Sequence, residues 1–443
     1  MNKKFLFIQP TLYDDHDNLV KKKRLYFVGL AFPLLAAMLP EDWTSEICVE
    51  VIEDIPFDTD ADVIGLGTMG HSARRAVDIA KEFKKRGKTV IVGGPMVSLV
   101  PEVAKEYCDS VMIGDADAEL MTRMCRDIEN GSLQPFYQKS FDCYQTFSTP
   151  LPRYDMLIKK RIGDFLPVQA GRGCPNLCKF CSIAGIYKGK HLRRPIDEVI
   201  RDIQYIKSLG FKKFLLLDDN IVVDEQYTLE LCARIKPLKM KWMSQCAIQI
   251  GNKPNLLKAA AESGCYVLSL GLESINKAFM KEFNKEFNDP SQYLRIIQSI
   301  NDAGIDVATE MIVGSDYDTP ESLSETLEFV RKSNIVAAKF YCLTPVPGTD
   351  YYDECKEKGV LIHDDTFRYT PSAATVNTPN MTAAQMTEQY WALYKKLYTM
   401  GAILKRTLFN KRMFRHPLRT GFFFVVNMFY RYQIKRKIAP NIF

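Results

Sequence analysis

The sequence predicts an α/β protein with two parallel-sheet domains in series, followed by a helical C-terminal region. Short apolar runs alternate with longer stretches whose apolar residues recur at helical spacing, which indicates parallel strands joined by right-handed crossovers. Acidic residues are absent after residue 404, so the composition changes there. We therefore expect domains at 1–135 and 164–360, a linker at 136–163, and a C-terminal region at 361–443.

Residues 1–135 predict a doubly wound sheet. The expected strands are Lys4–Gln9, Glu46–Ile52, Val63–Gly67, Thr89–Val92 and Ser110–Ile113. Such sheets bind ligands at the carboxyl ends of their strands, where glycine lets a bulky ligand approach the backbone. The candidates at these ends are Gly67, Thr68, Met69, Gly93, Gly94 and Gly114. No Gly-x-Gly-x-x-Gly follows the first strand and no Walker lysine occurs, which disfavours an ordinary nucleotide site.

Residues 164–360 repeat a strand and a helix, which predicts a partial barrel of six units. The expected strands are Asp164–Ala170, Phe214–Leu217, Lys241–Ala247, Tyr266–Leu270, Val307–Val313 and Ala338–Leu343. Between the last two, Thr319 and Pro320 are typical of a helix start. In parallel barrels the chemistry lies where the strands end and their loops begin.

Three cysteines, Cys174, Cys178 and Cys181, follow the first of these strands. Thiolates at this spacing can reach three corners of one small cluster, and a four-iron cluster held this way keeps one iron without a protein ligand. A zinc site completed by a distant fourth ligand is an alternative. The 12 cysteines are scattered and Met1 leads directly into a strand-like segment, so a disulfide framework is disfavoured and a reducing cytoplasm is expected.

Polar side chains at other strands of the predicted barrel are further candidates. Asp218 and Asp219 follow the second strand, Gln245 lies at the end of the third, and Glu273 closes the fourth. Glu310 lies within an apolar strand, where a carboxylate is costly to bury without a partner. Asp218 and Asp219 have an alternative interpretation as a loop start or a helix cap, and Glu273 has one as a solvated carboxylate.

The spacing Cys174-x3-Cys178-x2-Cys181, with Phe180 before the last cysteine, resembles the signature of radical S-adenosylmethionine (SAM) enzymes. The resemblance implies a (β/α)6 barrel, a [4Fe-4S] cluster on the three cysteines, and SAM bound to the open iron. Reductive cleavage of SAM would then produce a 5′-deoxyadenosyl radical. It also implies that Phe180 contacts adenine and that the polar residues at the strand ends lie near SAM. Packing of Phe180 as a loop hydrophobe is the alternative.

Ahead of such a barrel, Val63–Gly70, Val90–Pro95 and Val111–Asp115 resemble the Rossmann-like cobalamin-binding domain of cobalamin-dependent radical SAM enzymes. This implies that the glycines and their neighbours at the first domain's strand ends contact cobalamin. The Asp-x-His-x-x-Gly motif of other cobalamin proteins is missing from the sequence, so we expect no histidine below the cobalt. His71 is an alternative ligand or the start of a helix.

The combined resemblance implies hydrogen abstraction from an unactivated carbon and then methyl transfer from methylcobalamin. It also implies an electron donor such as flavodoxin or ferredoxin. Two alternatives remain open: a cyclase, oxidase or rearrangement enzyme with the same cofactors, and a non-catalytic metal- or cobalamin-binding regulator. A methylthiotransferase is disfavoured, because those relatives carry further cysteines ahead of the barrel.

The C-terminal tail carries the positive charge of the chain. From Lys405 to the end there are ten Lys and Arg and no Asp or Glu, interleaved with aromatic residues. The apolar run Gly421–Tyr430 is too short to cross a bilayer. Residues 405–438 therefore predict either peripheral contact with a membrane or an anionic, lipid-like small molecule, or a helix packed across the two domains. Nucleic acid is disfavoured, because no recognition module accompanies the tail.

Overall fold

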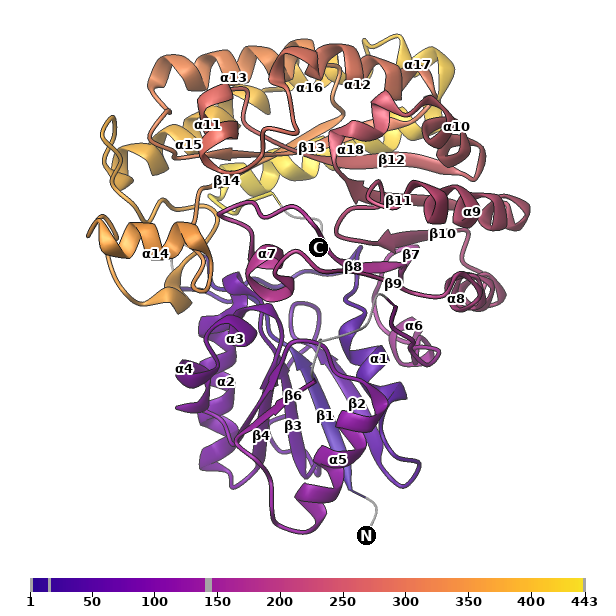
Figure 1. Cartoon of the computed structure of the whole chain (residues 1–443), viewed down its shortest axis with the longest axis vertical. Coiled ribbons are helices and arrows are strands. Elements are labelled where there is room, and N and C mark those ends of the chain that lie inside the picture. The colour runs from indigo at the N-terminus through magenta and orange to yellow at the C-terminus, as the bar shows by residue number, and fades with distance from the viewer. Residues whose placement is uncertain (1–2, 15–16, 140–145, 441–443) are drawn as a thin grey trace.

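The computed structural model describes residues 3–14, 17–139 and 146–440, and its two large sheets are stacked along the long axis of the molecule (Figure 1). The first sheet has the strand order β2-β1-β3-β4-β5-β6, and the second has the order β14-β13-β12-β11-β10-β7. All strand pairs within both sheets are parallel. The α/β class predicted from strand–helix alternation is confirmed.

The first unit follows the predicted strand order with small shifts. Its strands are β1 (Lys4–Gln9), β2 (Thr44–Val49), β3 (Val63–Gly67), β4 (Thr89–Gly93), β5 (Ser110–Ile113) and β6 (Phe136–Gln138). Its helices are α1 (Ala31–Ala37), α2 (Ala73–Lys85), α3 (Pro95–Leu99), α4 (Pro101–Lys105) and α5 (Ala118–Glu129). The expected strand Glu46–Ile52 begins and ends earlier, because the chain turns after Val49. β6 lies in the stretch expected to be a linker, as does α6 (Asp155–Ile158).

Helices of the first unit form where one face can be buried. In α2 the buried residues recur three and four apart and end with Phe83, which packs under the sheet. α5 begins where the Asp117 side chain accepts a hydrogen bond from the Leu120 backbone N–H at 2.8 Å, a typical helix cap. These helices hold the parallel sheet rigid on both faces.

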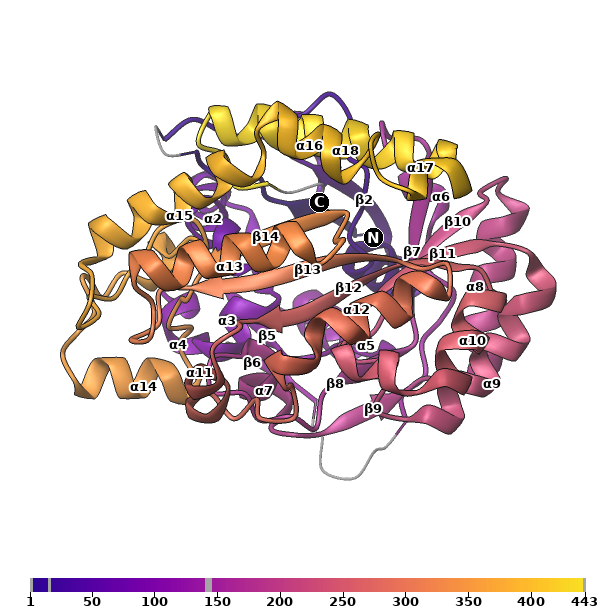
Figure 2. The same ribbon diagram turned by 90° about the horizontal axis from the view of Figure 1, so that it is seen from above.

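The second unit is the predicted open barrel. Its strands are β7 (Phe165–Gln169), β10 (Lys213–Leu217), β11 (Lys241–Cys246), β12 (Cys265–Glu273), β13 (Asp306–Val313) and β14 (Ala337–Cys342). Its outer helices are α8 (Ile196–Ser208), α9 (Glu225–Ile235), α10 (Pro254–Glu262), α12 (Tyr293–Asp302) and α13 (Pro320–Lys332) (Figure 2). Thr319 caps α13 and Pro320 is its first residue, as predicted. The short helices α11 (Lys277–Glu282) and α14 (Asp350–Glu357) follow β12 and β14.

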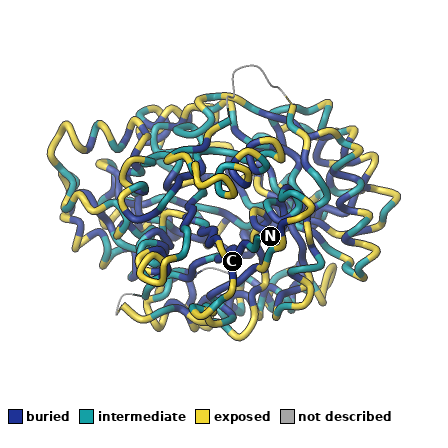
Figure 3. Tube along the Cα trace, turned by 90° about the horizontal axis from the view of Figure 1, so that it is seen from below, coloured by how far each residue is buried: buried dark blue, intermediate teal, exposed yellow. Residues whose placement is uncertain are grey.

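Burial alternates along β10, β11 and most of β13, which separates a helix-covered face from an inner one, whereas β7 and β14 are buried almost throughout. Figure 3 maps burial along the whole described chain. In β11, Trp242, Ser244 and Cys246 are buried under the helices, whereas Met243 is half-buried and Gln245 is exposed. Since side chains of a strand alternate between faces, Gln245 lies on the inner face. A register shift between Gly271 and Glu273 interrupts the pairing of β12 with β13. Polar side chains of the inner face are therefore available to a ligand.

Tyrosine hydroxyls of the C-terminal region form hydrogen bonds with the free edge of strand β14. The helices of this region are α15 (Ala383–Leu397), α16 (Met400–Arg406), α17 (Arg412–Arg415) and α18 (Pro417–Lys435). The Tyr398 hydroxyl accepts a hydrogen bond from the Ala338 N–H at 3.1 Å and donates one to the Ala338 carbonyl at 2.7 Å. Tyr394 makes the same pair of bonds with Phe340. An open strand edge is a site of unwanted pairing, and these hydroxyls occupy it.

α18 packs one face against the barrel. Its buried residues include Phe423, Asn427 and Tyr430, and Asn427 donates a hydrogen bond to the Val336 carbonyl at 2.9 Å. Phe423 also joins a cluster with Phe27 and Phe165, so the helix contacts both units, as the packed-helix alternative expects. No helix in the described part of the chain is long and apolar enough to span a membrane.

Replacing Tyr398 by Phe should lower the free energy of unfolding by about 1–3 kcal/mol, because it leaves a buried N–H and a buried carbonyl of β14 without a partner. Urea denaturation of the purified chain measures the difference. Tyr432→Phe is the matched control, since Tyr432 is 54% exposed and its loss should change the free energy by less than about 0.5 kcal/mol. Equal effects of the two substitutions would contradict the role of Tyr398 at the strand edge.

Candidate functional site

The three cysteines lie on one loop beyond the carboxyl end of β7. The loop leaves from β8 (Gly171–Gly173) and returns through β9 (His191–Arg193), which pairs antiparallel with β8. Cys174 directly follows β8, and Cys181 is the residue that precedes α7 (Ser182–Tyr187). Gly173 has a φ of +76°, and a side chain there would lie 2.2 Å from the Lys190 carbonyl. Only glycine therefore permits this entry into the loop.

The cysteine sulfurs lie among hydrogen-bond donors and one cation. Asn220 Nδ2 lies 3.9 Å from Cys174 Sγ, and backbone N–H groups at the start of α7 face the sulfur of Cys181. Burial raises the pKa of all three thiols, that of Cys178 to about 12, while Lys285 acts in the opposite direction. Donors and a nearby cation stabilise the thiolate, which is the form that binds a metal.

The donor set fits an iron–sulfur cluster. Among residues 3–14, 17–139 and 146–440, no three His, Cys, Asp or Glu side chains are arranged to hold a single metal ion. A four-iron cluster is wider than one ion, and three cysteines on one loop supply thiolates for three of its irons. The fourth iron would remain open, as the sequence predicts.

Two predicted carboxylates fix the position of this loop. Asp219 Oδ2 accepts a hydrogen bond from the Gly173 N–H at 2.6 Å, next to Cys174. Asp218 Oδ2 pairs with Arg193 Nη1 at 2.5 Å, and Asp218 Oδ1 accepts from the Asn220 N–H at 2.9 Å. Burial raises the pKa of Asp219 to about 6. Both residues thus tie β8 and β9 to the end of β10, and contact of either with SAM stays a prediction.

Glu273 and Lys285 form a buried ion pair beside the cysteines. They are 9% and 8% exposed, and the ammonium lies 5.8 Å above the Phe180 ring. Burial acts against the charge of Lys285, but Glu273 and the cysteine sulfurs outweigh it and raise the pKa of Lys285. Glu273 has a φ of +62°, a backbone conformation that non-glycine residues adopt at a cost of about 1 kcal/mol or more and that clusters at functional sites.

Phe180 and Glu310, two further candidates of the barrel, lie in different surroundings. Phe180 packs against Phe279 and Phe283, with ring centroids 6.3 and 5.8 Å away, so it is a loop hydrophobe in this structure, and its contact with adenine stays a prediction. Glu310 pairs with Lys339 at 2.9 Å across β13 and β14, which supplies the partner that a carboxylate in an apolar strand requires. The proximity of Glu310 raises the pKa of Lys339, although burial opposes this.

The structure brings together the candidates of the first unit. Gly67 and Gly93 are partners in register at the ends of β3 and β4, and Gly114 follows the adjacent β5. Thr68 is 1% exposed and its hydroxyl donates to the Gly93 carbonyl at 2.8 Å, whereas Met69 is 53% exposed. A side chain at Gly94 would lie 2.5 Å from the Thr68 carbonyl. The chain's own packing therefore requires glycine there, in addition to any ligand.

His71 lies in the 3₁₀ helix η1 (Gly70–Ser72), which leads directly into α2. Its place at a helix start agrees with one of the two expectations from the sequence. Burial, with the charge of Lys22, lowers the pKa of His71, so its imidazole is neutral. Ligation of cobalt by His71 stays the alternative prediction for this residue.

Asp115 connects the two candidate sites. It follows Gly114 at the carboxyl end of β5, accepts a hydrogen bond from the Tyr187 hydroxyl at 2.8 Å, and pairs with Arg172 at 3.1 Å. Arg172 belongs to β8 and Tyr187 to α7, so one carboxylate holds both ends of the cysteine loop. α3, which follows β4, packs against α7 beside it. The carboxyl edge of the first sheet consequently faces the cysteine loop.

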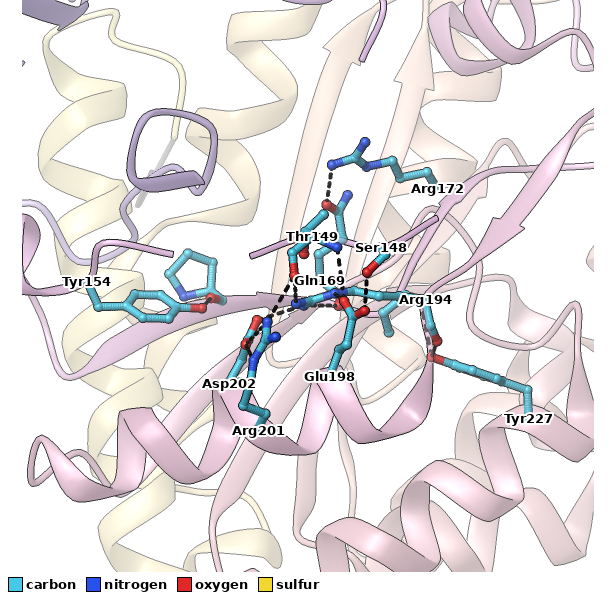
Figure 4. Close-up of polar contacts among 12 residues, drawn as sticks. Ser148, Thr149, Tyr154, Gln169, Arg172, Arg194, Glu198, Arg201, Asp202 and Tyr227 are labelled. Carbon is cyan, nitrogen blue, oxygen red and sulfur yellow. Dashed lines mark hydrogen bonds and ion pairs between the residues drawn. The ribbon is translucent and has the colours of Figure 1, made fainter. Parts of the chain in front are cut away.

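A second buried network fixes the chain where it leaves β9 (Figure 4). Arg194 is 1% exposed and pairs with Asp202 at 2.7 Å and with Glu198 at 3.0 Å. Glu198 also accepts the Thr149 N–H at 3.0 Å, which joins the segment before the barrel to α8. The Tyr227 hydroxyl donates to the Arg194 carbonyl at 2.7 Å. The loop exit is thus held by buried charges.

Sequence patterns missed several residues of this site. Lys285, Arg193 and Lys339 became candidates only through their partners Glu273, Asp218 and Glu310, which are 12, 25 and 29 residues away in the chain. The only indication of these cations in the sequence was the carboxylates at the strand ends, because a buried carboxylate needs a partner.

Comparisons with known proteins agree with this geometry. Residues 168–330 match the model of the radical SAM superfamily. Bacteriochlorophyllide d C-8(2)-methyltransferase of Chlorobaculum tepidum is 29% identical over 416 residues, covering 90% of each chain. Anaerobic magnesium-protoporphyrin IX monomethyl ester cyclase of Rubrivivax gelatinosus is 24% identical over 373 residues, which are 76% of this chain and 65% of that one.

Among solved structures, the radical SAM methyltransferase TsrM from Kitasatospora setae, with cobalamin and a [4Fe-4S] cluster bound, superposes with a TM-score of 0.65. The match covers 88% of this chain and 84% of TsrM at 13% identity. It therefore extends over both sheets and supports the fold. The chain is an enzyme with a radical SAM domain at residues 168–330, and as a whole it has the two-domain fold seen in TsrM.

Proposed function

We propose that this enzyme is a cobalamin-dependent radical SAM C-methyltransferase. The observation that carries the proposal is the Asp115 bridge, which joins the carboxyl edge of the first sheet to the cysteine loop at Arg172 and Tyr187. A ligand on that edge and a ligand on the loop would face each other across one interface. The bacteriochlorophyllide methyltransferase, related over 90% of the chain, supports methyl transfer.

When bound, the cluster with SAM supplies a carbon-centred radical, and cobalamin supplies a methyl group. The chain's own part is to hold and orient these groups. Cys174, Cys178 and Cys181 would hold the cluster. Residues of the inner barrel face and the loop would surround SAM: Phe180, Asp218, Asp219, Gln245, Glu273 and Glu310. Residues at the ends of β3, β4 and β5 would contact the corrin: Gly67, Thr68, Met69, Gly93, Gly94 and Gly114.

Charge at the site supports this assignment. Lys285 keeps a positive charge beside the cysteines and is held by Glu273, so it offsets the negative charge of a thiolate-bound cluster. Glu310 and Lys339 add a second ion pair on adjacent strands of the inner face. Buried pairs of this kind keep their geometry, because removing one partner leaves an uncompensated charge. They are suited to orient a polar substrate without moving.

We infer further that the substrate is a small molecule, that flavodoxin or ferredoxin supplies the electron, and that the protein works in the cytoplasm. The domain limits 1–135 and 164–360 are part of the same proposal.

The alternative is a cyclase, oxidase or rearrangement enzyme that uses both cofactors without methyl transfer. The similarity to the magnesium-protoporphyrin cyclase, which is 24% identical, supports this alternative.

Replacing Cys178 by Ala should reduce 5′-deoxyadenosine formation to background, because two thiolates cannot hold the cluster. The measurement uses anaerobically reconstituted protein with SAM and dithionite, and iron and sulfide are determined alongside. Cys48→Ala is the control, since Cys48 is a buried thiol of the first sheet and should leave both values unchanged. Undiminished 5′-deoxyadenosine in Cys178→Ala would refute the cluster assignment.

With methyl-deuterated SAM, cobalamin and a small-molecule extract, the enzyme should place an intact deuterated methyl group on one extracted compound. Mass spectrometry detects the product, and a reaction without cobalamin is the control. If 5′-deoxyadenosine accumulates while an extracted compound changes without gaining label, the cyclase or oxidase alternative holds instead. If neither 5′-deoxyadenosine nor label appears, the protein is better explained as a binding regulator.

A further inference from the structure

The start of the C-terminal tail displays apolar side chains and cations together. Phe409, Phe414 and Leu418 are 79%, 90% and 92% exposed, and no other large hydrophobic side chain in the described part of the chain exceeds 62%. Lys405, which precedes them, and Lys411 and Arg415, which lie between them, are also exposed. From Lys405 to the end of the chain there is no Asp or Glu. We call these six residues the tail surface.

The backbone that carries the tail surface is anchored. Asn410 donates a hydrogen bond to Asn334 at 2.7 Å, next to Phe409. Arg412 and Arg419 pair with Asp306 at 2.8 and 2.7 Å, and Asp306 is 1% exposed at the amino end of β13. Each apolar residue therefore lies within two positions of a residue that is fixed to the barrel. The segment is held in place while its apolar side chains face solvent.

This arrangement is costly unless something covers it. Large apolar side chains gain free energy when they leave water, and these three forgo that gain while they are exposed. Arg412 and Arg419, on either side of Phe414, attach this segment to Asp306 of the barrel. α18 continues the pattern, because Val425 and Tyr432 are 62% and 54% exposed opposite its buried face. Figure 2 shows α16, α17 and α18 along one flank, across the molecule from α7, β8 and β9.

We propose that the tail surface binds peripherally to an anionic membrane, with Phe409, Phe414 and Leu418 entering the interface and the cations beside lipid headgroups. Large apolar side chains flanked by Lys and Arg are the composition that interfacial segments share. A second copy of the chain is a poor partner, because two surfaces with cations and no carboxylates repel each other. The inference goes beyond the proposed function and requires neither cofactor.

Vesicle cosedimentation of the full chain tests this. The chain should sediment with phosphatidylcholine–phosphatidylserine vesicles and not with pure phosphatidylcholine, and binding should fall as salt screens the headgroups. Lys411→Gln should weaken binding about fivefold, the share expected of one cation near an anionic surface. The triple variant Phe409→Ser, Phe414→Ser, Leu418→Ser should weaken it by at least about tenfold, since its apolar contact with the interface is lost.

The matched control replaces three hydrophobic residues exposed elsewhere, Val103→Ser, Ile158→Ser and Ile362→Ser, and should bind like the parent. Phe414→Trp adds a second readout: its fluorescence should shift to the blue with anionic vesicles, whereas Ile362→Trp should not respond. No binding to anionic vesicles, or equal binding by both triple variants, would overturn the proposal. Self-association that the tail triple variant abolishes would also overturn it, in favour of a second copy.

Discussion

Three carboxylates, Asp115, Asp218 and Asp219, hold the cysteine loop, and the chemistry of the protein depends on them. Asp218 pairs with Arg193 and Asp219 accepts the Gly173 N–H, so the barrel positions the loop from one side. Asp115 pairs with Arg172 and accepts the Tyr187 hydroxyl, so the first sheet positions it from the other. The Asp218–Arg193 pair is the buried one of these contacts, and breaking such a pair by removing one partner typically costs about 3–5 kcal/mol.

This constraint explains why two parallel sheets meet at their carboxyl ends. Each sheet alone offers a ligand site at that edge, which is a general property of the architecture. Asp115 joins the two edges, so ligands bound on them would face each other, with the Glu273–Lys285 pair beside the cysteines. Phe180 packs against Phe279 and Phe283 and covers one side of the loop.

The cysteine loop and most strands of both sheets could be predicted from the sequence, because the patterns that indicate them each lie within a few neighbouring residues. The cysteine spacing, the strand ends and the Thr319 cap of α13 are each encoded within a few residues. Three-residue strands such as β6 and β8 were missed, because they are too short for periodicity to register. Lys285, Arg193 and the tyrosines that close β14 were missed, because their partners are distant in the chain and only folding brings them together. The sequence explained glycine at position 94 only by a ligand. Its close contact with Thr68, which also requires glycine, arises only when β3 and β4 pair.

A crystal structure of the anaerobically reconstituted enzyme with hydroxocobalamin and SAM would test the shared interface most directly. The corrin should lie on the carboxyl ends of β3, β4 and β5, against Gly67, Gly93 and Gly114. The cluster should be held by Cys174, Cys178 and Cys181, with SAM between it and the corrin and the Asp115–Arg172 pair intact. A corrin bound elsewhere, or a metal site on other cysteines, would contradict the account.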